Sequence, residues 1–158
     1  MNDIIIRPAT ASDLPVLLQF EQAIINAERP FDDTLIPSTF NYYDLAAMIE
    51  NSDVQVIVAE VNNELVGSGH VRIRAGDHYN NFERYAFLGF MYVVPAYRGK
   101  GINQMIVDAL TAWSRKKGLD EVRLLVYNNN EPAIKAYEKA GFKKLLIEMR
   151  MSFDNNKS

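Results

Sequence analysis

Hydrophobic spacing in the first fifty residues predicts one short strand followed by helices. Ile4–Arg7 is predicted to be a strand. It is followed by Thr10-Ala11-Ser12-Asp13, in which a hydroxyl precedes an acid by three residues, close to the capping box that begins a helix. Apolar residues then recur on one helical face up to about Ala27. After a loop, a second and shorter helix is predicted near Tyr42 to Asn51.

From Val54 onward the pattern is that of a sheet. Val54–Val61 and Leu65–Arg74 are rich in Val and Ile and flank Asn62-Asn63. Two Asn residues tolerate the positive φ angles of a tight hairpin turn, so an antiparallel pair is expected. The next run, Tyr85 to Val94, is apolar almost throughout, as in a strand buried on both faces. We expect it to pair with the second strand.

Helices and strands alternate in the second half of the chain. A helix that begins at Ile102 ends in Arg115-Lys116-Lys117-Gly118, where cations and glycine suit a helix C-terminus. A strand over Glu121–Tyr127, a helix over Pro132–Ala140 and a final strand over Leu145–Phe153 are predicted to follow.

The predicted fold class is α/β (α+β), with a mixed, mostly antiparallel central sheet of about six strands flanked by about four helices. The chain shows no internal repeat and no long linker. We therefore expect one domain over residues 1–153 and a polar tail over residues 154–158.

Composition removes several functions. The 158 residues include no Cys and only two His, so thiolate metal sites, disulfides and a covalent Cys nucleophile are excluded, and we expect no metal. With 17 basic and 20 acidic residues, the chain has no global field that would attract nucleic acid. No signal peptide is evident, and the longest apolar run is about half of the roughly 20 residues that span a bilayer. A cytoplasmic protein is expected.

A glycine-bearing turn over residues 98–103 is the most informative segment. It lies between the buried strand and the helix that begins at Ile102. Free backbone N–H groups and the positive end of the helix dipole should therefore converge there and favour a phosphate. Arg98 and Lys100 add positive charge. Because a third glycine is absent after Gly99-x-Gly101, the dinucleotide fingerprint does not fit.

Two motifs resemble those of the GNAT family of N-acetyltransferases. Arg98 and Gly101 match its signature of Arg or Gln, two residues, Gly, one residue, then Gly or Ala, with Asn103 at the last position. The segment Asn130 to Phe142 resembles the family's Asn-x-x-Ala-x-x-x-Tyr-x-x-x-Gly-Phe pattern at the same spacing. The resemblance implies the fold of an acyl-CoA N-acyltransferase over most of the chain.

The resemblance also implies direct transfer of the acetyl group of acetyl-CoA to a primary amine, without a covalent enzyme intermediate. Tyr137 would be the general acid that protonates the departing thiolate. Asn130 would contact the pantetheine. The pyrophosphate would bind backbone N–H groups of the glycine turn, namely Arg98, Gly99, Lys100, Gly101, Ile102 and Asn103. The pantetheine would lie like an added strand along the end of the buried strand, namely Met91, Tyr92, Val93 and Val94.

A basic group on and after the last predicted helix could reach the 3′-phosphate of CoA. A solvated helix face would explain these residues equally well. They are Lys135, Lys139, Lys143 and Lys144.

The general base is not evident. Many relatives carry a carboxylate on the central strand where this chain has Gly89 and Phe90. Glu60 and His70, on neighbouring strands, are candidates, and His70 could instead be a half-buried residue bonded to backbone. Glu83 and Tyr127 are weaker candidates.

An acidic loop after the first helix could attract a cationic amine. Its acids are Glu28, Asp32 and Asp33, with Phe31, Tyr42 and Tyr43 as an apolar wall. A solvated acidic loop is the alternative explanation.

Two questions stay open at this stage. A non-catalytic acyl-CoA-binding sensor would also fit, because the strand carboxylate is missing, although Tyr137 argues for catalysis. A homodimer could form if the final strand presents an edge.

Overall fold

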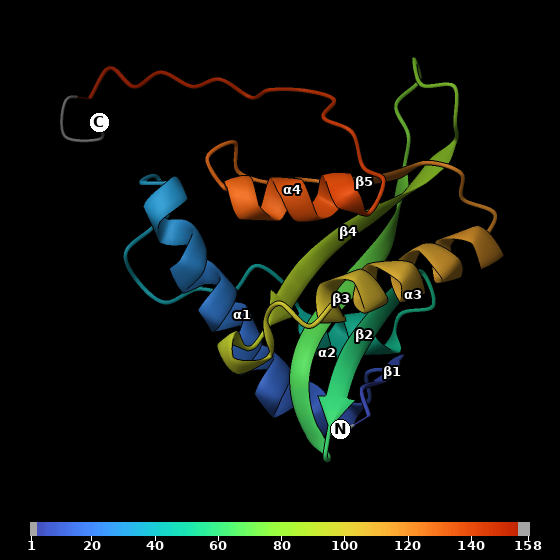
Figure 1. Ribbon diagram of the computed structural model, residues 1–158. Helices are drawn as coiled ribbons and strands as arrows, with labels where there is room; N and C mark the ends of the chain where they lie inside the picture. The colour runs from blue at the N-terminus through green and yellow to red at the C-terminus, as the bar shows by residue number, and fades with distance from the viewer. Residues whose placement is uncertain (1–2, 155–158) are drawn as a thin grey trace.

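The computed structural model describes residues 3–154 and consists of one five-stranded sheet with helices on both faces (Figure 1). The strand order is β1-β2-β3-β4-β5. All neighbours are antiparallel except β4 and β5, which are parallel. The elements are β1 (Ile5–Pro8), α1 (Leu14–Glu28), α2 (Leu45–Glu50), β2 (Val54–Val61), β3 (Glu64–Ala75), β4 (Arg84–Val93), α3 (Ile102–Lys116), β5 (Val122–Leu124) and α4 (Glu131–Lys139), with 3₁₀ turns at Ala11–Asp13, Arg29–Phe31 and Pro95–Tyr97.

The predicted fold class is confirmed, with five strands in place of about six among the described residues. The β2–β3 hairpin turns at Asn62 and Asn63, which have φ angles of 51° and 66°. Positive φ at both central residues is the geometry expected of a tight primed turn. The predicted helices are present, and the second is shorter than expected, at six residues.

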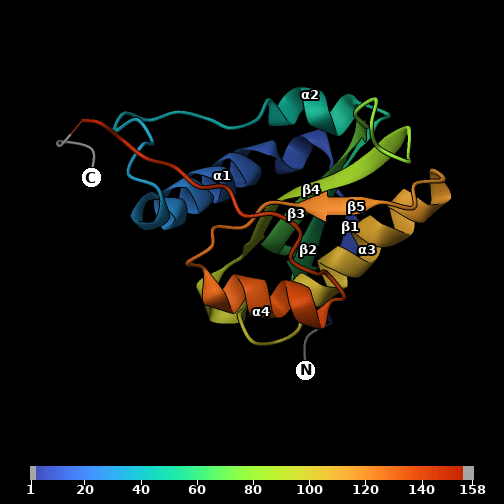
Figure 2. The same ribbon diagram turned by 90° about the horizontal axis from the view of Figure 1, so that it is seen from above.

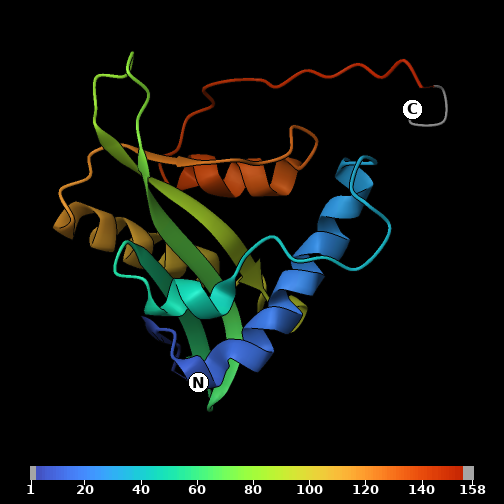
Figure 3. The same ribbon diagram turned by 180° about the vertical axis from the view of Figure 1, so that it is seen from behind.

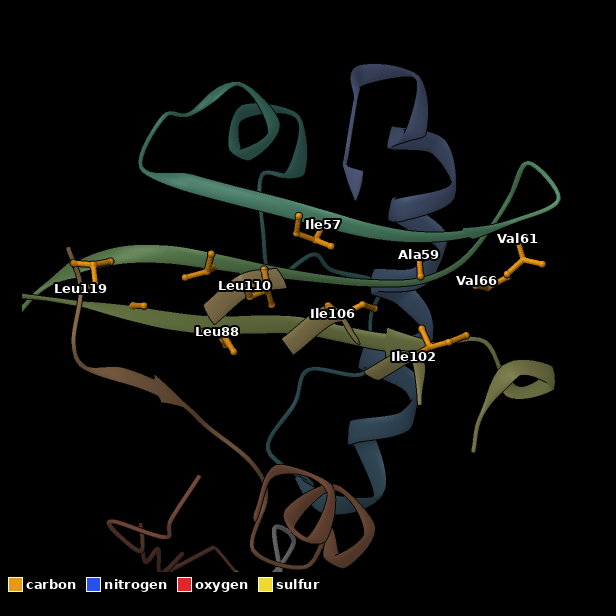
Figure 4. Packing of buried hydrophobic residues seen from close by; sticks show 11 residues of the cluster. Ile57, Ala59, Val61, Val66, Leu88, Ile102, Ile106, Leu110 and Leu119 are labelled. Carbon is orange, nitrogen blue, oxygen red and sulfur yellow. The ribbon is translucent and has the colours of Figure 1, made fainter. Parts of the chain in front are cut away.

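Helices α1 and α2 cover one face of the sheet, and α3 and α4 lie on the other (Figure 2). Strand β2 supplies both cores through its period of two. Ile57, Ala59 and Val61 pack with α3 (Figure 4). Val56 and Val58 pack with α1 and α2. The run of Val and Ile in β2 is therefore buried on both faces.

A β-bulge interrupts β4 at Phe90. His70 of β3 lies opposite Gly89 and Ser68 lies opposite Tyr92, so two steps on β3 match three on β4. Phe90 has a φ of 58°, and its carbonyl accepts a hydrogen bond of 3.0 Å from the Ser68 hydroxyl. A positive φ is rare for a bulky residue, and here it accompanies the extra residue of the bulge.

The bulge reverses the alternation of β4. Ala86 and Leu88 belong to the core on the α3 side, whereas Phe90 belongs to the core on the α1 side. After the bulge, Met91 and Val93 pack on the α3 side. Gly89 and Phe90 consequently follow one another on the α1 face.

Strand β5 is much shorter than its predicted range of Glu121–Tyr127. Only Val122, Arg123 and Leu124 pair with β4, opposite Ala86 to Leu88. Beyond Leu88 the two parallel strands separate, and the β5-facing edge of β4 has no strand partner among the described residues.

The prediction of a final strand over Leu145–Phe153 is wrong for the single chain. These residues are extended, but within the described part of the chain no backbone–backbone hydrogen bond involves residues 143–153. The segment runs away from the body of the protein (Figure 3). Alternating side chains favour an extended backbone, but a strand also needs a partner edge, and this segment does not meet one. Asp154 begins the predicted polar tail, and residues 155–158 lie outside the described residues.

Candidate active site

The glycine turn forms an open cradle of backbone donors at the start of α3. Gly99 and Gly101 have φ angles of 77° and 81°, values that only glycine adopts readily. None of the N–H groups of residues 99–104 donates to an acceptor among the described residues. A Cβ added at either glycine would meet nothing within 4 Å. The cradle therefore has the donors, the helix dipole and the space for a phosphate group.

The flanking cations lie against the end of β4. The Nε of Arg98 donates to the Val93 carbonyl at 3.0 Å, and its guanidinium lies 5.8 Å from the centre of the Tyr92 ring. The Nζ of Lys100 lies 5.9 Å from the centre of the Tyr97 ring. The Ile102 side chain is buried in the core and anchors the first turn of α3. The positive charge is thus held beside the free N–H groups.

The open edge of β4 leads into this cradle. Val94 uses its N–H on the carbonyl of Val66 of β3, at 2.9 Å. Because backbone groups of successive residues face opposite edges of a strand, the N–H of Val93 faces the side where β5 has diverged. Met91 to Val94 are half-buried. An extended ligand could lie along this edge as an added strand.

A buried glutamate, which the sequence analysis did not select, holds residues 41–43 in place. Glu21 is 0% exposed. Its carboxyl accepts hydrogen bonds from the Asn41 amide at 2.7 Å and from the backbone N–H groups of Tyr42 and Tyr43 at 2.8 Å each. The sequence held a sign of this role, because Glu21 stands at a position of the first helix where the apolar periodicity predicts an apolar residue.

Tyr43 and His70 fill the space beside Gly89. Their ring centres are 4.6 Å apart, and His70 stacks on Phe90 at 5.8 Å. A Cβ at Gly89 would lie 2.9 Å from Cε1 of His70 and 3.2 Å from the Tyr43 hydroxyl. The position where relatives carry a carboxylate therefore has no room for one in this chain.

His70 itself is 0% exposed, and neither ring nitrogen has a hydrogen-bond partner among the described residues. Burial, with Arg72 as the next cause, lowers the pKa of His70 to about 3. His70 is therefore neutral at pH 7. The alternative prediction, a half-buried His70 bonded to backbone, is therefore wrong. Arg72, whose Nε is also buried without a partner, lies 5.9 Å from the centre of the Tyr43 ring.

The charge of Glu28, at the end of α1, reaches Tyr43 in the following loop and Tyr137 of α4. Burial raises the pKa of Glu28, whose carboxylate accepts a hydrogen bond of 2.7 Å from the Tyr42 hydroxyl. Burial also raises the pKa of Tyr137 to about 12, with the charges of Glu28 and Tyr43 as further causes. The Tyr137 hydroxyl donates to no described residue, and its ring packs edge-on against Phe142 at 5.9 Å. Tyr137 thus keeps its proton at neutral pH.

The loop after α1 contacts the loop after β5. The Tyr127 hydroxyl donates to Asp32 at 3.1 Å, and the Tyr127 ring stacks on Phe31 at 5.8 Å. Burial and Asp32 raise the pKa of Tyr127 to about 12. Asp33 points elsewhere and lies 3.6 Å from Arg150. Of the predicted acidic loop, Phe31 and Asp32 therefore contact Tyr127. The charge of Glu28 reaches both Tyr127 and Tyr137.

Two predicted base candidates are not brought to this region. Glu60 lies on β2, which β3 separates from β4, and it forms an ion pair of 3.2 Å with Arg7. Glu83 lies in the β3–β4 loop, where it lines a pocket with Gly76, Asp77 and Phe82 among others.

Asn130 caps α4, since its side chain accepts the Ala133 N–H at 3.3 Å. The basic set on and after α4 is exposed. Within residues 3–154, no group of three or more His, Asp or Glu could hold a metal ion. In the same range, no helix has the length and apolar character that a membrane crossing requires.

Comparison with known proteins assigns the chain to a family. Residues 21–142 match the model of the acetyltransferase (GNAT) family. An N-alpha-acetyltransferase of Sulfurisphaera tokodaii is 30% identical over 119 residues, which are 71% of this chain and 70% of that protein. The chain therefore belongs to the GNAT acetyltransferase family.

Solved structures share this fold. A mutant of the BH1408 protein of Bacillus halodurans has a TM-score of 0.83 at 17% identity, over 94% of this chain and 99% of that one. A protein of Clostridium acetobutylicum, described as a predicted acetyltransferase and solved with acetyl-CoA, has a TM-score of 0.69 at 18% identity, over 95% and 96% of the two chains.

Glu21→Ala is expected to destabilise the segment of residues 41–43. Three donors would lose their acceptor, and each unsatisfied buried group costs about 1–3 kcal/mol, so the free energy of unfolding should fall by at least about 2 kcal/mol. Urea unfolding measures this loss, and hydrogen exchange should show faster exchange at Tyr42 and Tyr43. Glu50→Ala, which removes an exposed acid from α2, is the control. Equal stability of the two variants would contradict the assignment.

Proposed function

We propose that this protein transfers the acetyl group of acetyl-CoA to a primary amine by direct attack of the amine on the thioester. The observation that carries the proposal is the Tyr137 hydroxyl. It retains its proton, donates to no described residue and lies within the electrostatic reach of Glu28 and Tyr43. A proton donor without a partner among the described residues, within reach of an acidic group, is suited to a leaving thiolate.

The cradle and the open edge of β4 support the proposed binding of CoA. The N–H groups of residues 99–103 would hold the pyrophosphate, with Arg98 and Lys100 as counter-charges. The backbone of Met91 to Val94 would hold the pantetheine, with the Asn130 side chain on its other side. The free donors and the empty space at both glycines fit this ligand.

In the proposed reaction, the amine nitrogen bonds to the acetyl carbon as the carbon–sulfur bond breaks. The electron pair of that bond goes to sulfur, and Tyr137 gives its proton to the resulting thiolate. The nitrogen loses one proton. The products are an amide and free CoA thiol. Holding the two reactants in contact would supply much of the rate gain.

Glu28 is the residue that we propose as proton acceptor, directly or through water. An alkyl amine is only about one part in two thousand neutral at pH 7, so an acceptor lowers the barrier. Burial makes Glu28 more basic than an ordinary glutamate. His70 is a poorer acceptor because its pKa is about 3, and Glu60 is held by Arg7. Glu28, with Asp32 nearby, also favours a cationic acceptor.

The non-catalytic sensor is not favoured. Its support was the missing carboxylate on β4. His70 and Tyr43 occupy that space, so the absence follows from packing and does not indicate lost catalysis.

Gly101→Ala should weaken binding of CoA. An added Cβ would enter the cradle, and loss of one charge-assisted hydrogen bond, about 1.5–3 kcal/mol, corresponds to about a 10- to 100-fold rise in Kd. Titration calorimetry with CoA measures it. Gly118→Ala is the matched control, because Gly118 has a φ of 76°, equally open surroundings and a place at the other end of α3. Equal Kd values for both variants would refute the proposed phosphate site.

Tyr137→Phe should lower kcat for thiol release by about 10²- to 10⁴-fold, because the thiolate would leave without a proton. The Kd for CoA should change little. The assay uses acetyl-CoA with a panel of amines that includes a peptide α-amine, the group suggested by the Sulfurisphaera relative, and aminoglycosides. Tyr79→Phe, at an exposed tyrosine, is the control. Wild-type protein that binds CoA but acetylates no amine would favour the sensor.

Glu28→Gln should remove the acidic limb of the pH–rate profile. Because the pKa of Glu28 is raised, wild-type kcat/KM should fall as the pH drops through a value above the ordinary glutamate range near about 4.3. The amide cannot take a proton, so its profile should lack this limb and lie below the wild-type profile. Glu50→Gln should keep the wild-type profile. An unchanged limb in Glu28→Gln would exclude Glu28 as the acceptor.

A further inference from the structure

Arg72 of β3 lies on the same face of the sheet as His70. In the antiparallel pairing of β3 with β4, His70 is opposite Gly89 and Arg72 is opposite Phe87. Residues two positions apart point to the same face of a strand. Val71, which lies between them, belongs to the core on the α3 side. The Arg72 side chain therefore projects on the α1 side, about 7 Å along the strand from His70.

Tyr43 lies between Arg72 and the position where β4 separates from β5. The Tyr43 hydroxyl is 3.2 Å from the place that a Cβ at Gly89 would take. The centre of the Tyr43 ring is 5.9 Å from the Arg72 guanidinium, and the centre of the Phe87 ring is 5.6 Å from it. Aromatic rings attract a guanidinium at such distances. Two rings therefore hold the cation beside the end of the β4–β5 pairing.

Arg72 has no polar partner, unlike the other half-buried arginines of the described residues. Arg7 and Arg123 form ion pairs with carboxylates, and Arg29 donates to backbone carbonyls. The Arg72 guanidinium forms no hydrogen bond and no ion pair with a described residue, and its Nε is buried. Burial and the charge of Arg74 lower the pKa of Arg72, but an arginine stays charged at pH 7. A half-buried charge without a counter-charge is unfavourable, so the free protein favours binding of an anion there.

A charge of the opposite sign acts on the same tyrosine. Burial raises the pKa of Tyr43, the charge of Glu28 raises it further, and the charge of Arg72 lowers it. Tyr43 is therefore within reach of a carboxylate and of a guanidinium. A ligand that lies along Tyr43 would meet one group that attracts an amine and another that attracts an anion.

The guanidinium limits the chemistry of that anion. Its planar fork of N–H donors matches the paired oxygens of a carboxylate or a phosphate. Arg72 is half-buried, so a ligand can reach the side chain although its Nε is covered.

We propose, on the basis of the proposed function, that the acceptor carries an anionic group, a carboxylate or a phosphate, in addition to its amine, and that Arg72 binds this group. Arg72 then selects zwitterionic acceptors over amines without an anion. The amine would react beside Gly89 and the anion would lie one strand repeat away, so the two charges of the acceptor should be about 7 Å apart.

The test compares anionic acceptors with uncharged acceptors of the same length. One pair is 6-aminohexanoate and 6-aminohexanamide, and the other is 3-aminopropyl phosphate and 3-aminopropan-1-ol. The wild type should favour the anionic member of at least one pair by about 10- to 100-fold in kcat/KM, the effect of a charge-assisted hydrogen bond. Comparison of the two pairs identifies which anion Arg72 takes.

Arg72→Met should abolish this preference. Methionine keeps an unbranched apolar stem between the rings of Tyr43 and Phe87 and removes the charge. For the preferred anionic acceptor, KM should rise by about 10- to 100-fold, and so should its Kd for the CoA-bound protein, measured by calorimetry without turnover. The kcat/KM for the uncharged acceptor and the Kd for CoA should change little. Arg74→Met is the matched control, because it removes the same charge from the same face of β3 at an exposed position, and it should keep the preference.

Several outcomes would overturn the inference and leave the proposed function standing. One is a wild type that acetylates the uncharged members as well as the anionic ones. Another is an equal loss in Arg72→Met for both members of a pair, which would indicate a structural role. A third is an equal loss of preference in Arg72→Met and Arg74→Met, which would indicate a general effect of positive charge. A wild type that binds CoA and acetylates no amine contradicts the proposed function itself, and the inference with it.

Discussion

One extra residue in the central strand is the constraint on which the site depends. The bulge at Phe90 places two residues of β4, Phe90 and Met91, opposite one residue of β3, Gly69, and turns Phe90 from the α3 core to the α1 core. Bulges bend a strand and increase its twist, and β4 separates from β5 directly beyond Leu88. The open strand edge is therefore a product of backbone geometry in β4. It needs no side chain of its own, and the helix cradle of residues 98–103 lies at its end.

The same bulge sets the chemistry beside the edge. It brings Gly89 and Phe90 to one face, where Tyr43 and His70 pack against them. Tyr43 and His70 beside Gly89 both stay neutral at pH 7. The carboxylates of the proposed site are instead those of Glu28 and Asp32, on and after α1. Charge is separated along the proposed site, with Arg98 and Lys100 at the end proposed for the phosphates and Glu28 and Asp32 at the end proposed for the amine.

Local signals allowed much of this structure to be predicted. The Asn62-Asn63 turn, the cap and amphipathic face of α3 and both motifs depend on residues within a few positions of each other, and each prediction was confirmed as an element of the fold. Features decided by distant partners were not predictable. Glu21 meets Asn41 to Tyr43 twenty residues later, β5 ends where β4 bends away, and the pattern of residues 145–153 encodes a strand without specifying the edge that receives it. The roles of Tyr137, Asn130 and the glycine turn came from the family resemblance, and their catalytic and binding functions stay proposals.

The carboxyl of Glu21 has a consequence for how such a protein can diversify. It fixes Tyr42 and Tyr43 at one end of the loop that follows α1, and α1 fixes Glu28 at the other end. The loop residues between them are therefore held at both ends. Surface loops accept changes in sequence and length more readily than the elements they connect. Residues 32–39 can therefore drift toward a new acceptor while the tyrosines and Glu28 keep their places. Under the proposed function, changes in residues 32–39 would alter substrate choice while Glu28 keeps its place as proton acceptor.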